Sequence, residues 1–122
     1  KTTVMVLDLP FEMPDFILLK EDVFRRFVGI GSWDNVVLNR YPEFAKKFYL
    51  KSEQPEALKA WMPAALVNFF VHQSYYHIEV QGKSMLLFEK ERLASVSEVE
   101  KMVQFAQKLL EVLEGLEAPK SS

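Results

Sequence analysis

A chain of 122 residues, 49% of them hydrophobic and 13% aromatic, is long and apolar enough to build one domain with its own core. Its formal net charge of −2 provides no basic field to attract a phosphate backbone, so we expect no nucleic-acid partner. The absence of cysteine excludes disulfides, thiol catalysis and thiolate metal sites.

Two short apolar runs open the chain. Residues 3–9 and 16–20 are rich in Val, Leu, Ile and Phe, and the loop between them contains Pro10 and Pro14, which interrupt a regular ladder. The pattern predicts a strand, a loop and a second strand.

The next segment predicts a short helix followed by two strands. Apolar residues spaced by three and four over 23–28, with acids just before them, favour a helix of one or two turns that ends near Gly29. After a turn, residues 35–39 and 46–52 are expected as strands on either side of a Tyr-Pro-Glu-Phe corner at 41–44.

Residues 55–72 are expected to be helical. Pro55 stands in the first turn, where its missing N–H costs nothing, and an apolar stripe follows at spacings of three and four. Pro63 removes a hydrogen bond in the middle, so the pattern predicts a kink, or two abutting helices, near Trp61 and Met62. The stripe comprises Leu58, Trp61, Met62, Ala65, Leu66, Phe69 and Phe70.

Residues 75–90 predict a β-hairpin, because the first arm alternates apolar with polar side chains and a Gly-Lys pair follows it. Two registers are open at this glycine. A two-residue turn would place Val80 opposite Met85, whereas a three-residue turn would place Ile78 opposite Leu86.

The clearest helix follows this hairpin. Ser95 and Ser97 each stand three residues before a glutamate, at Glu98 and Glu100, so two overlapping capping boxes can start it. We expect it to end at Gly115. Its apolar stripe comprises Val99, Met102, Val103, Ala106, Leu109, Leu110 and Leu113.

The order of these elements predicts an α+β fold. We expect an antiparallel sheet of about five to six strands with two main helices packed on one face. Residues 1–115 should form this single domain, and residues 116–122 a flexible tail.

Residues 34–50 carry the run Asp-Asn-Val-Val, then Arg-Tyr-Pro-Glu-Phe, then Lys-Lys-Phe-Tyr-Leu. This run resembles a group of uncharacterised bacterial membrane proteins in which a pair of transmembrane helices precedes a soluble α+β domain. Their pattern is of the type Asp-Ile-x-Phe, then His-Pro-Glu-Phe, a basic pair and Tyr/Phe-x-Leu. Residues 56–63 are similar to the helix that those proteins carry next. The likeness covers about half the chain and departs at Tyr41, where the group has His, so no role of that imidazole transfers.

The resemblance implies a context and no biochemical activity. It implies a soluble domain of a membrane-anchored bacterial protein, expected on the cytoplasmic side, with the membrane tether outside this sequence. A first residue of Lys1 rather than Met fits that expectation. Within the sequence, the longest nearly apolar run, 64–71, is far shorter than the roughly twenty residues that cross a bilayer.

No arrangement of residues predicts a catalytic centre or a metal site. His72 and His77 are the only histidines, their spacing does not converge on one face of a helix, and no third ligand of the right kind stands nearby. Ser74 lacks the flanking glycines of a nucleophile elbow. We therefore expect no cofactor and no metal, and the sequence leans against an enzyme.

Four acids are the remaining candidates for chemistry. Asp8, Glu12 and Asp15 lie in or beside the first loop, where paired carboxylates could hold separated pKa values for acid–base work. Acids in such a loop are usually solvated, and nothing in the sequence places them in a cleft. Glu43 is expected to cap backbone N–H groups at its corner or to pair with a neighbouring base, with a binding role as the alternative.

The leading hypothesis is a non-enzymatic domain that acts through an unknown protein partner or through self-association. The alternative is a small apolar-ligand or lipid-binding domain with a cavity between sheet and helices, and a carboxylate hydrolase comes third. The candidates for ligand binding are Trp61, Phe69, Phe88 and Glu43, although aromatic residues at these spacings are more often core.

Overall fold

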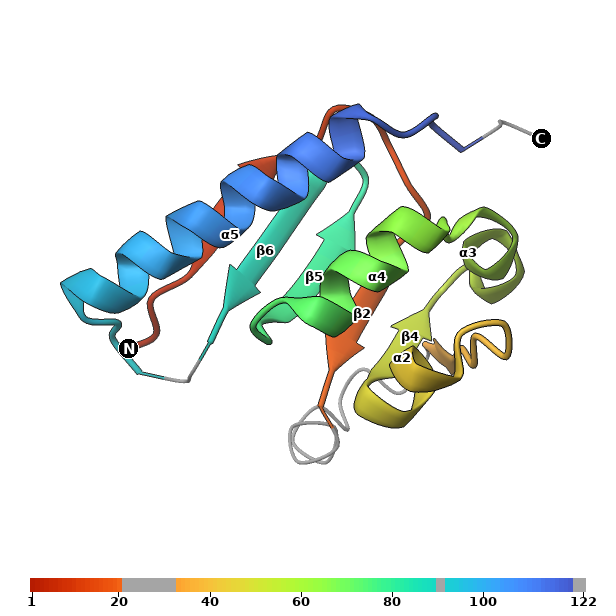
Figure 1. Ribbon diagram of the computed structural model, residues 1–122, viewed down its shortest axis with the longest axis horizontal. Helices are drawn as coiled ribbons and strands as arrows, with labels where there is room; N and C mark the ends of the chain where they lie inside the picture. The colour runs from red at the N-terminus through yellow and green to blue at the C-terminus, as the bar shows by residue number, and fades with distance from the viewer. Residues whose placement is uncertain (21–32, 90–91, 120–122) are drawn as a thin grey trace.

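The computed structural model describes residues 1–20, 33–89 and 92–119. Within these ranges, six strands form one antiparallel sheet in the order β1-β6-β5-β2-β4-β3, which confirms the α+β expectation (Figure 1). The strands are β1 (Met5–Asp8), β2 (Phe16–Leu19), β3 (Asp34–Asn35), β4 (Tyr49–Ser52), β5 (His77–Gln81) and β6 (Ser84–Phe88). The helices are α2 (Pro42–Lys47), α3 (Pro55–Trp61), α4 (Ala64–His72) and α5 (Val96–Glu114).

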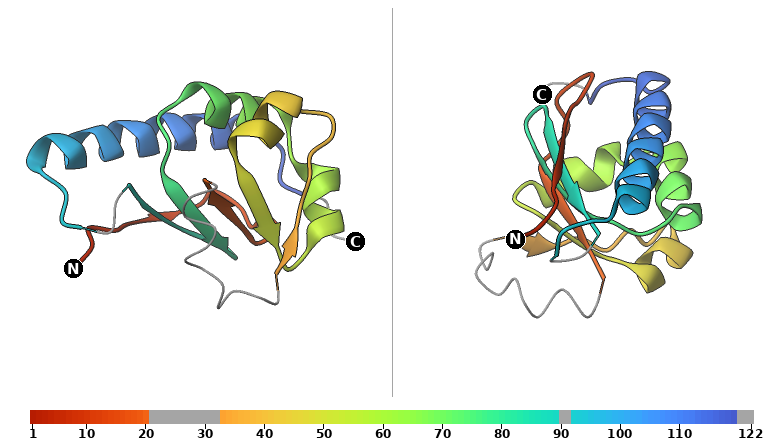
Figure 2. Two further views of the ribbon diagram at one scale, coloured as in Figure 1. Left: turned by 90° about the horizontal axis from the view of Figure 1, so that it is seen from below. Right: turned by 90° about the vertical axis from the view of Figure 1, so that its left-hand side faces the viewer.

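The helices cover one face of the sheet. Both views of Figure 2 place α4 and α5 on the same side of the strands, and α2 packs beside α4. The main core lies between this helical layer and the sheet. Side chains from the two central strands, such as Phe16, Leu18, Ile78 and Val80, are almost completely buried in it.

Strand β2 is buried on both of its faces. Phe16 and Leu18 point into the main core, while Ile17 and Leu19 lie on the opposite face and are exposed by only 2% and 0%. Burial on both sides explains why this strand is a continuous apolar run and does not alternate with polar residues.

The hairpin adopts the first of the two expected registers. Val80 pairs with Met85 and Gln81 with Ser84, so the turn contains two residues. Gly82, its first residue, has a φ of +60°, which is the conformation that a type II′ turn requires of glycine.

The helical segment 55–72 is broken at proline, as expected. Met62 ends α3 by donating its N–H to the Leu58 carbonyl at 2.8 Å, and its ψ of 107° leaves the helical region. Pro63 then precedes α4, and its carbonyl accepts the N–H of Val67 at 3.1 Å. The residue before a proline avoids the helical region, which accounts for the break.

The expectation for the Tyr-Pro-Glu-Phe corner was wrong. The segment is helix α2 rather than a corner between two longer strands, and β3 contains two residues only. Pro42 occupies the first turn, Glu43 stands at the positive end and two lysines at the negative end, so the segment carries ordinary helix signals. Phe44 and Phe48, four residues apart, turn their rings towards each other at 5.1 Å.

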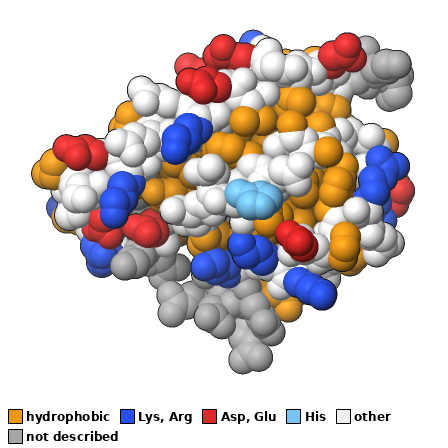
Figure 3. All heavy atoms as spheres, in the orientation of Figure 1, with side chains coloured by type: hydrophobic (Ala, Val, Ile, Leu, Met, Phe, Trp, Pro, Cys, Tyr) orange, Lys and Arg blue, Asp and Glu red, His pale blue; other side chains and the backbone are white. Residues whose placement is uncertain are grey.

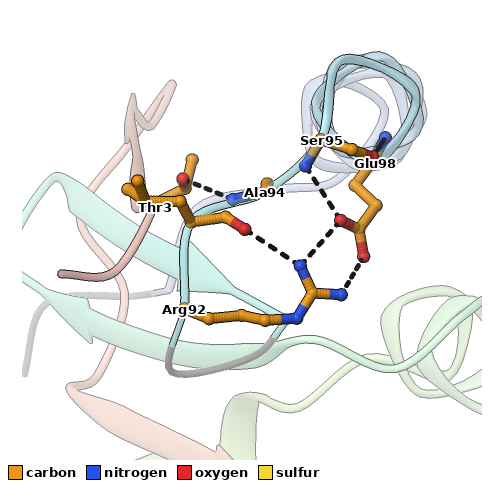
Figure 4. A network of polar contacts seen from close by, with 6 residues as sticks. Thr3, Arg92, Ala94, Ser95 and Glu98 are labelled. Atoms are coloured by element: carbon orange, nitrogen blue, oxygen red, sulfur yellow. Dashed lines mark hydrogen bonds and ion pairs between the residues drawn. The ribbon is translucent and has the colours of Figure 1, made fainter.

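The first of the two predicted capping boxes starts α5. Ser95 Oγ accepts the N–H of Glu98 at 3.1 Å, and Glu98 Oε1 accepts the N–H of Ser95 at 2.9 Å. Arg92 donates to both carboxylate oxygens of Glu98, and Ala94 donates its N–H to Thr3 Oγ1 at 2.7 Å (Figure 4). These contacts fix the beginning of α5 beside the beginning of the first strand.

The buried face of α5 is narrower than the predicted stripe. Met102, Ala106, Leu109 and Leu113 are buried together with Phe105. Three members of the stripe are not fully buried, because Leu110 is only partly buried and Val99 and Val103 are 36% and 40% exposed.

Two expectations, for residues 23–31 and for the tail at 116–122, are not tested by the structure. The predicted helix at 23–28 and the turn after it lie outside the described residues. The flexible tail at 116–122 stays a prediction, although Leu116 is partly buried against the core.

Candidate functional site

The structure has an open groove of about 1290 Å³ beside α3. Four separate segments contribute to its walls: residues 12–15, residues 53–63 on and around α3, Gly82, and residues 116–119. We refer to it as the α3 groove. Its walls come together only because the sheet places the hairpin turn beside the loop that precedes β2.

The floor of the α3 groove is held by hydrogen bonds centred on Asp15. Asp15 Oδ1 accepts the N–H of Gly82 at 3.0 Å, and the Asp15 N–H is donated to Gln54 Oε1 at 3.1 Å. Ser52, which is fully buried, donates its hydroxyl to the Asp15 carbonyl and accepts the N–H of Gln54 at 2.9 Å. These bonds tie three segments to one another, so the floor is pre-organised rather than loose.

Trp61 forms an apolar wall of the groove. Its ring meets Phe11 edge to face, with centroids 6.0 Å apart, and its indole N–H is donated to the Glu117 carbonyl at 3.3 Å. Met13 and Pro14 add further apolar side chains to the lining of the groove. A half-buried indole with a satisfied N–H presents a large, rigid contact area at little cost in conformational entropy.

The charged residues of the groove are all acidic. Glu12, Asp15, Glu53 and Glu117 line it, and none of the lining residues that the structure describes is Lys, Arg or His. Glu53 also accepts the indole N–H of Trp33 at 2.5 Å, which holds that carboxylate in place. The groove therefore presents a negative potential around a tryptophan.

The four candidate binding residues from the sequence are not brought together. Trp61 lines the α3 groove, whereas Phe69 is 8% exposed within the core between α4 and α5. Phe88 lies on the face of the sheet opposite the helices, where its ring stacks on His77 at 4.4 Å. Glu43 is exposed in the first turn of α2.

The three acids of the first loop are separated by the fold. Asp8 is exposed at the end of β1, while Glu12 and Asp15 reach the α3 groove. Because Asp15 accepts a backbone N–H and anchors the floor, it acts here as a structural carboxylate. The sequence did not predict that Ser52 and Gln54 would hold Asp15 in place. The only feature of the sequence that sets them apart is their position just before Pro55.

Both histidines are engaged within the fold. His77 is 1% exposed and its Nε2 lies 2.8 Å from Glu79 Oε2 on the same strand. His72, the last residue of α4, contacts the Asn68 carbonyl through Nδ1 at 2.8 Å. Among residues 1–20, 33–89 and 92–119, no three His, Cys, Asp or Glu side chains are arranged to hold a metal ion.

None of the helices in the described ranges is long and apolar enough to cross a bilayer. No protein-family model matches the chain, and neither a curated protein nor a solved structure matches it.

Proposed function

We propose that this protein is a binding domain, and that its α3 groove takes an extended segment of a partner protein that carries basic side chains. The observation that carries the proposal is the combination of four acidic residues and no basic residue around Trp61 in an open groove. Opposite charge on the two partners raises the association rate and fixes the register of a bound segment. Tryptophan in a pocket is among the commonest anchors of protein interfaces.

Trp61 also supports a basic partner. An Arg or Lys side chain lying over an indole gains a cation–π attraction in addition to its pairing with carboxylates. The pre-organised floor reduces the entropy that binding would otherwise lose. We propose binding rather than catalysis, because Asp15 is already engaged with a backbone N–H and Glu53 with an indole.

We further propose that the domain belongs to a membrane-anchored bacterial protein and lies on its cytoplasmic side. The support is the resemblance of residues 34–50 and 56–63 to such proteins. The apolar-ligand alternative has less support, because Trp61, Phe69 and Phe88 lie in three different places.

Isothermal titration calorimetry at low salt tests the groove. The probe is a peptide of about ten residues that alternates arginine with leucine, and the control peptide has glutamate in place of arginine. We expect the arginine peptide alone to bind and the indole N–H signal of Trp61 to shift on binding.

A matched pair of double variants locates the binding. Replacing Glu12 and Glu117 by Gln should weaken binding by about two- to thirtyfold, since exposed ion pairs contribute roughly 0.2–1 kcal/mol each. Replacing Glu43 and Glu111 by Gln removes the same charge outside the groove and should have a smaller effect. Equal binding of the two peptides, or equal loss in the two double variants, would exclude the proposal.

A further inference from the structure

The outer edge of β1 is an open strand edge. Among the described residues, β1 pairs with β6 alone and stands at one end of the sheet. The N–H of Leu9 is donated to the carbonyl of Lys83, the residue opposite it in the same register, at 2.7 Å. Hydrogen bonding alternates along an antiparallel pair, so Met5 and Leu7 also face β6. The backbone groups of Val4, Val6 and Asp8 therefore point away from the sheet.

The two ends of the sheet differ in how they are protected. The strand at the other end, β3, has two residues and begins with an exposed aspartate. Short, charged edge strands resist pairing with other chains. β1 has four residues and contains neither proline nor lysine, and its exposed charge, Asp8, stands at its end. It is therefore the edge at which another strand can be added.

Exposed valines surround this edge on both faces of the sheet. Val6 is 66% and Val4 41% exposed on the face opposite the helices. On the helical side, the first half of α5 presents Val96, Val99 and Val103, which are 77%, 36% and 40% exposed. Figure 3 shows hydrophobic side chains reaching the surface over this part of α5, at the left of the view.

The valines of α5 lie on its side away from α4. Phe105 marks the side towards α4, because its ring lies 5.2 Å from that of Phe69. At roughly 100° per residue, Val99 and Val103 lie on a different side of the helix from Phe105. The bond from Ala94 to Thr3 brings this end of the helix beside β1. The exposed valines of α5 and the free edge of β1 thus belong to one surface, which we call the β1 edge.

We propose that two copies of this chain associate through the β1 edge, with β1 pairing antiparallel to β1 of the second copy. The register that joins all the outward backbone groups places Val6 opposite Val6 of the second copy, and Val4 opposite its Asp8. The two-fold axis then passes midway between the two Val6 residues, perpendicular to the sheet. Side chains directly opposite one another point to the same face, so the helical layers of both copies lie on the same side.

In this dimer both parts of the β1 edge, the strand and the exposed valines of α5, are covered by the second copy. The six strands of each copy become one continuous sheet of twelve, and α5 packs beside α5 of the second copy through Val99 and Val103. A monomer seldom leaves a contiguous apolar patch of more than a few hundred Å² in water. A two-fold contact needs no other partner, because the same surface supplies both sides of it. A stable interface buries roughly 800 Å² per partner, so the dimer needs the helix pair in addition to the strand pair.

The β1 edge is separate from the α3 groove. None of Val4, Val6, Val96, Val99 and Val103 lines that groove. Association at the β1 edge and peptide binding in the groove can therefore succeed or fail independently.

Sedimentation equilibrium of the 122-residue chain tests the proposal. We expect a reversible dimer, and V6K should raise its dissociation constant by at least about tenfold because two lysines would then meet at the axis. The matched control is V37K, since Val37 is 56% exposed beside β3 at the other end of the sheet. V103K provides a second variant on the helical side, and circular dichroism checks that each variant folds.

Amide hydrogen exchange followed by NMR locates the contact. The N–H groups of Val4, Val6 and Asp8 should exchange more slowly as the protein is concentrated. Those of Met5 and Leu7 should be slow at every concentration, because they are bonded to β6. A monomer at all concentrations up to about 1 mM would overturn the proposal. A dimer that V6K leaves unchanged, or one whose newly protected amides lie elsewhere, would overturn it as well.

Discussion

The carboxylate of Glu98 serves two partners at once. It accepts a hydrogen bond from the backbone N–H of Ser95, the N-cap of α5. It also accepts hydrogen bonds from Nη1 and Nη2 of Arg92, at 3.1 and 2.9 Å. The Arg92 guanidinium and the Ser95 backbone N–H together lower the pKa of Glu98 to about 2 from its ordinary value of 4.5. The same ion pair raises the pKa of Arg92 above its usual value.

A lowered pKa makes the contribution of Glu98 depend on pH. The folded state favours the charged carboxylate of Glu98. Its stabilisation is therefore complete above the unfolded pKa near 4.5, and it is lost as pH falls through the folded pKa near 2. Glu98→Gln keeps an acceptor for the capping box but removes the charge. We expect the variant to unfold at lower urea concentration than the wild type at pH 7, and at nearly the same concentration close to pH 2.

Glu100→Gln is the control for this pH series. Glu100 is exposed on the same helix and belongs to the capping box that the protein does not use. Its substitution should leave the pH dependence of unfolding nearly unchanged. A gap between wild type and Glu98→Gln that stays constant from pH 7 to pH 2 would refute the assignment.

At the scale of elements, the start of α5 depends on one hydroxyl. Ser95→Ala should lower the free energy of unfolding by about 1 kcal/mol, because the Glu98 N–H loses its acceptor. Ser97→Ala is the matched control, since Ser97 lies inside the first turn and the observed cap is Ser95. Equilibrium urea unfolding compares the two variants. A larger loss for Ser97→Ala than for Ser95→Ala would mean that the helix begins two residues later.

Local sequence signals were sufficient for several elements. The cap at Ser95 and the break at Pro63 each depend on a few neighbouring residues, and the structure confirms both. The hairpin could be predicted as well, but its register could not, because the turn length depends on the φ that Gly82 adopts.

Other elements needed information from distant parts of the chain. Segment 42–47 carries both helix signals and large aromatic residues, and its helix packs Phe44 against α4, far away in sequence. The exposure of Val99 and Val103 depends on where α5 lies on the sheet, which nearby residues in the sequence do not determine. The α3 groove could not be predicted at all, since Asp15 meets Gly82 only after β2 has paired with β5.

At the scale of the whole molecule, a chain of aromatic rings connects the helical layer. Phe44 on α2 lies 6.5 Å from Phe70 on α4, and Phe70 lies 6.0 Å from Phe69. Phe69 in turn lies 5.2 Å from Phe105 on α5, which contacts Tyr76 at 4.6 Å. Because these contacts run from one helix to the next without a gap, we expect the helices to unfold together.

Phe44→Ala tests this coupling. Phe44 is 1% exposed, so its truncation should lower the free energy of unfolding by about 3–5 kcal/mol. The loss should appear equally in the tryptophan fluorescence, to which Trp33 and Trp61 both contribute, and in the helical circular dichroism signal, to which the 19-residue α5 contributes most. Val37→Ala, at an exposed position, should change stability by less than about 0.5 kcal/mol. Separate transitions for the two probes would show that the surroundings of the tryptophans and α5 belong to different cooperative units.

The strand order also has a consequence for the order of synthesis. The hairpin β5–β6 lies between β1 and β2 in the sheet, although it is translated long after both of them. Met5 pairs with Leu87 and Leu18 pairs with Ile78, so neither pair can form until the hairpin has been synthesised. During translation the two N-terminal strands therefore emerge without the partners that separate them, and direct pairing of β1 with β2 is a competing structure. The segment between these strands contains Pro10 and Pro14, which disfavour a direct β1–β2 pairing. The two strands therefore remain available to pair with the hairpin once it has been synthesised.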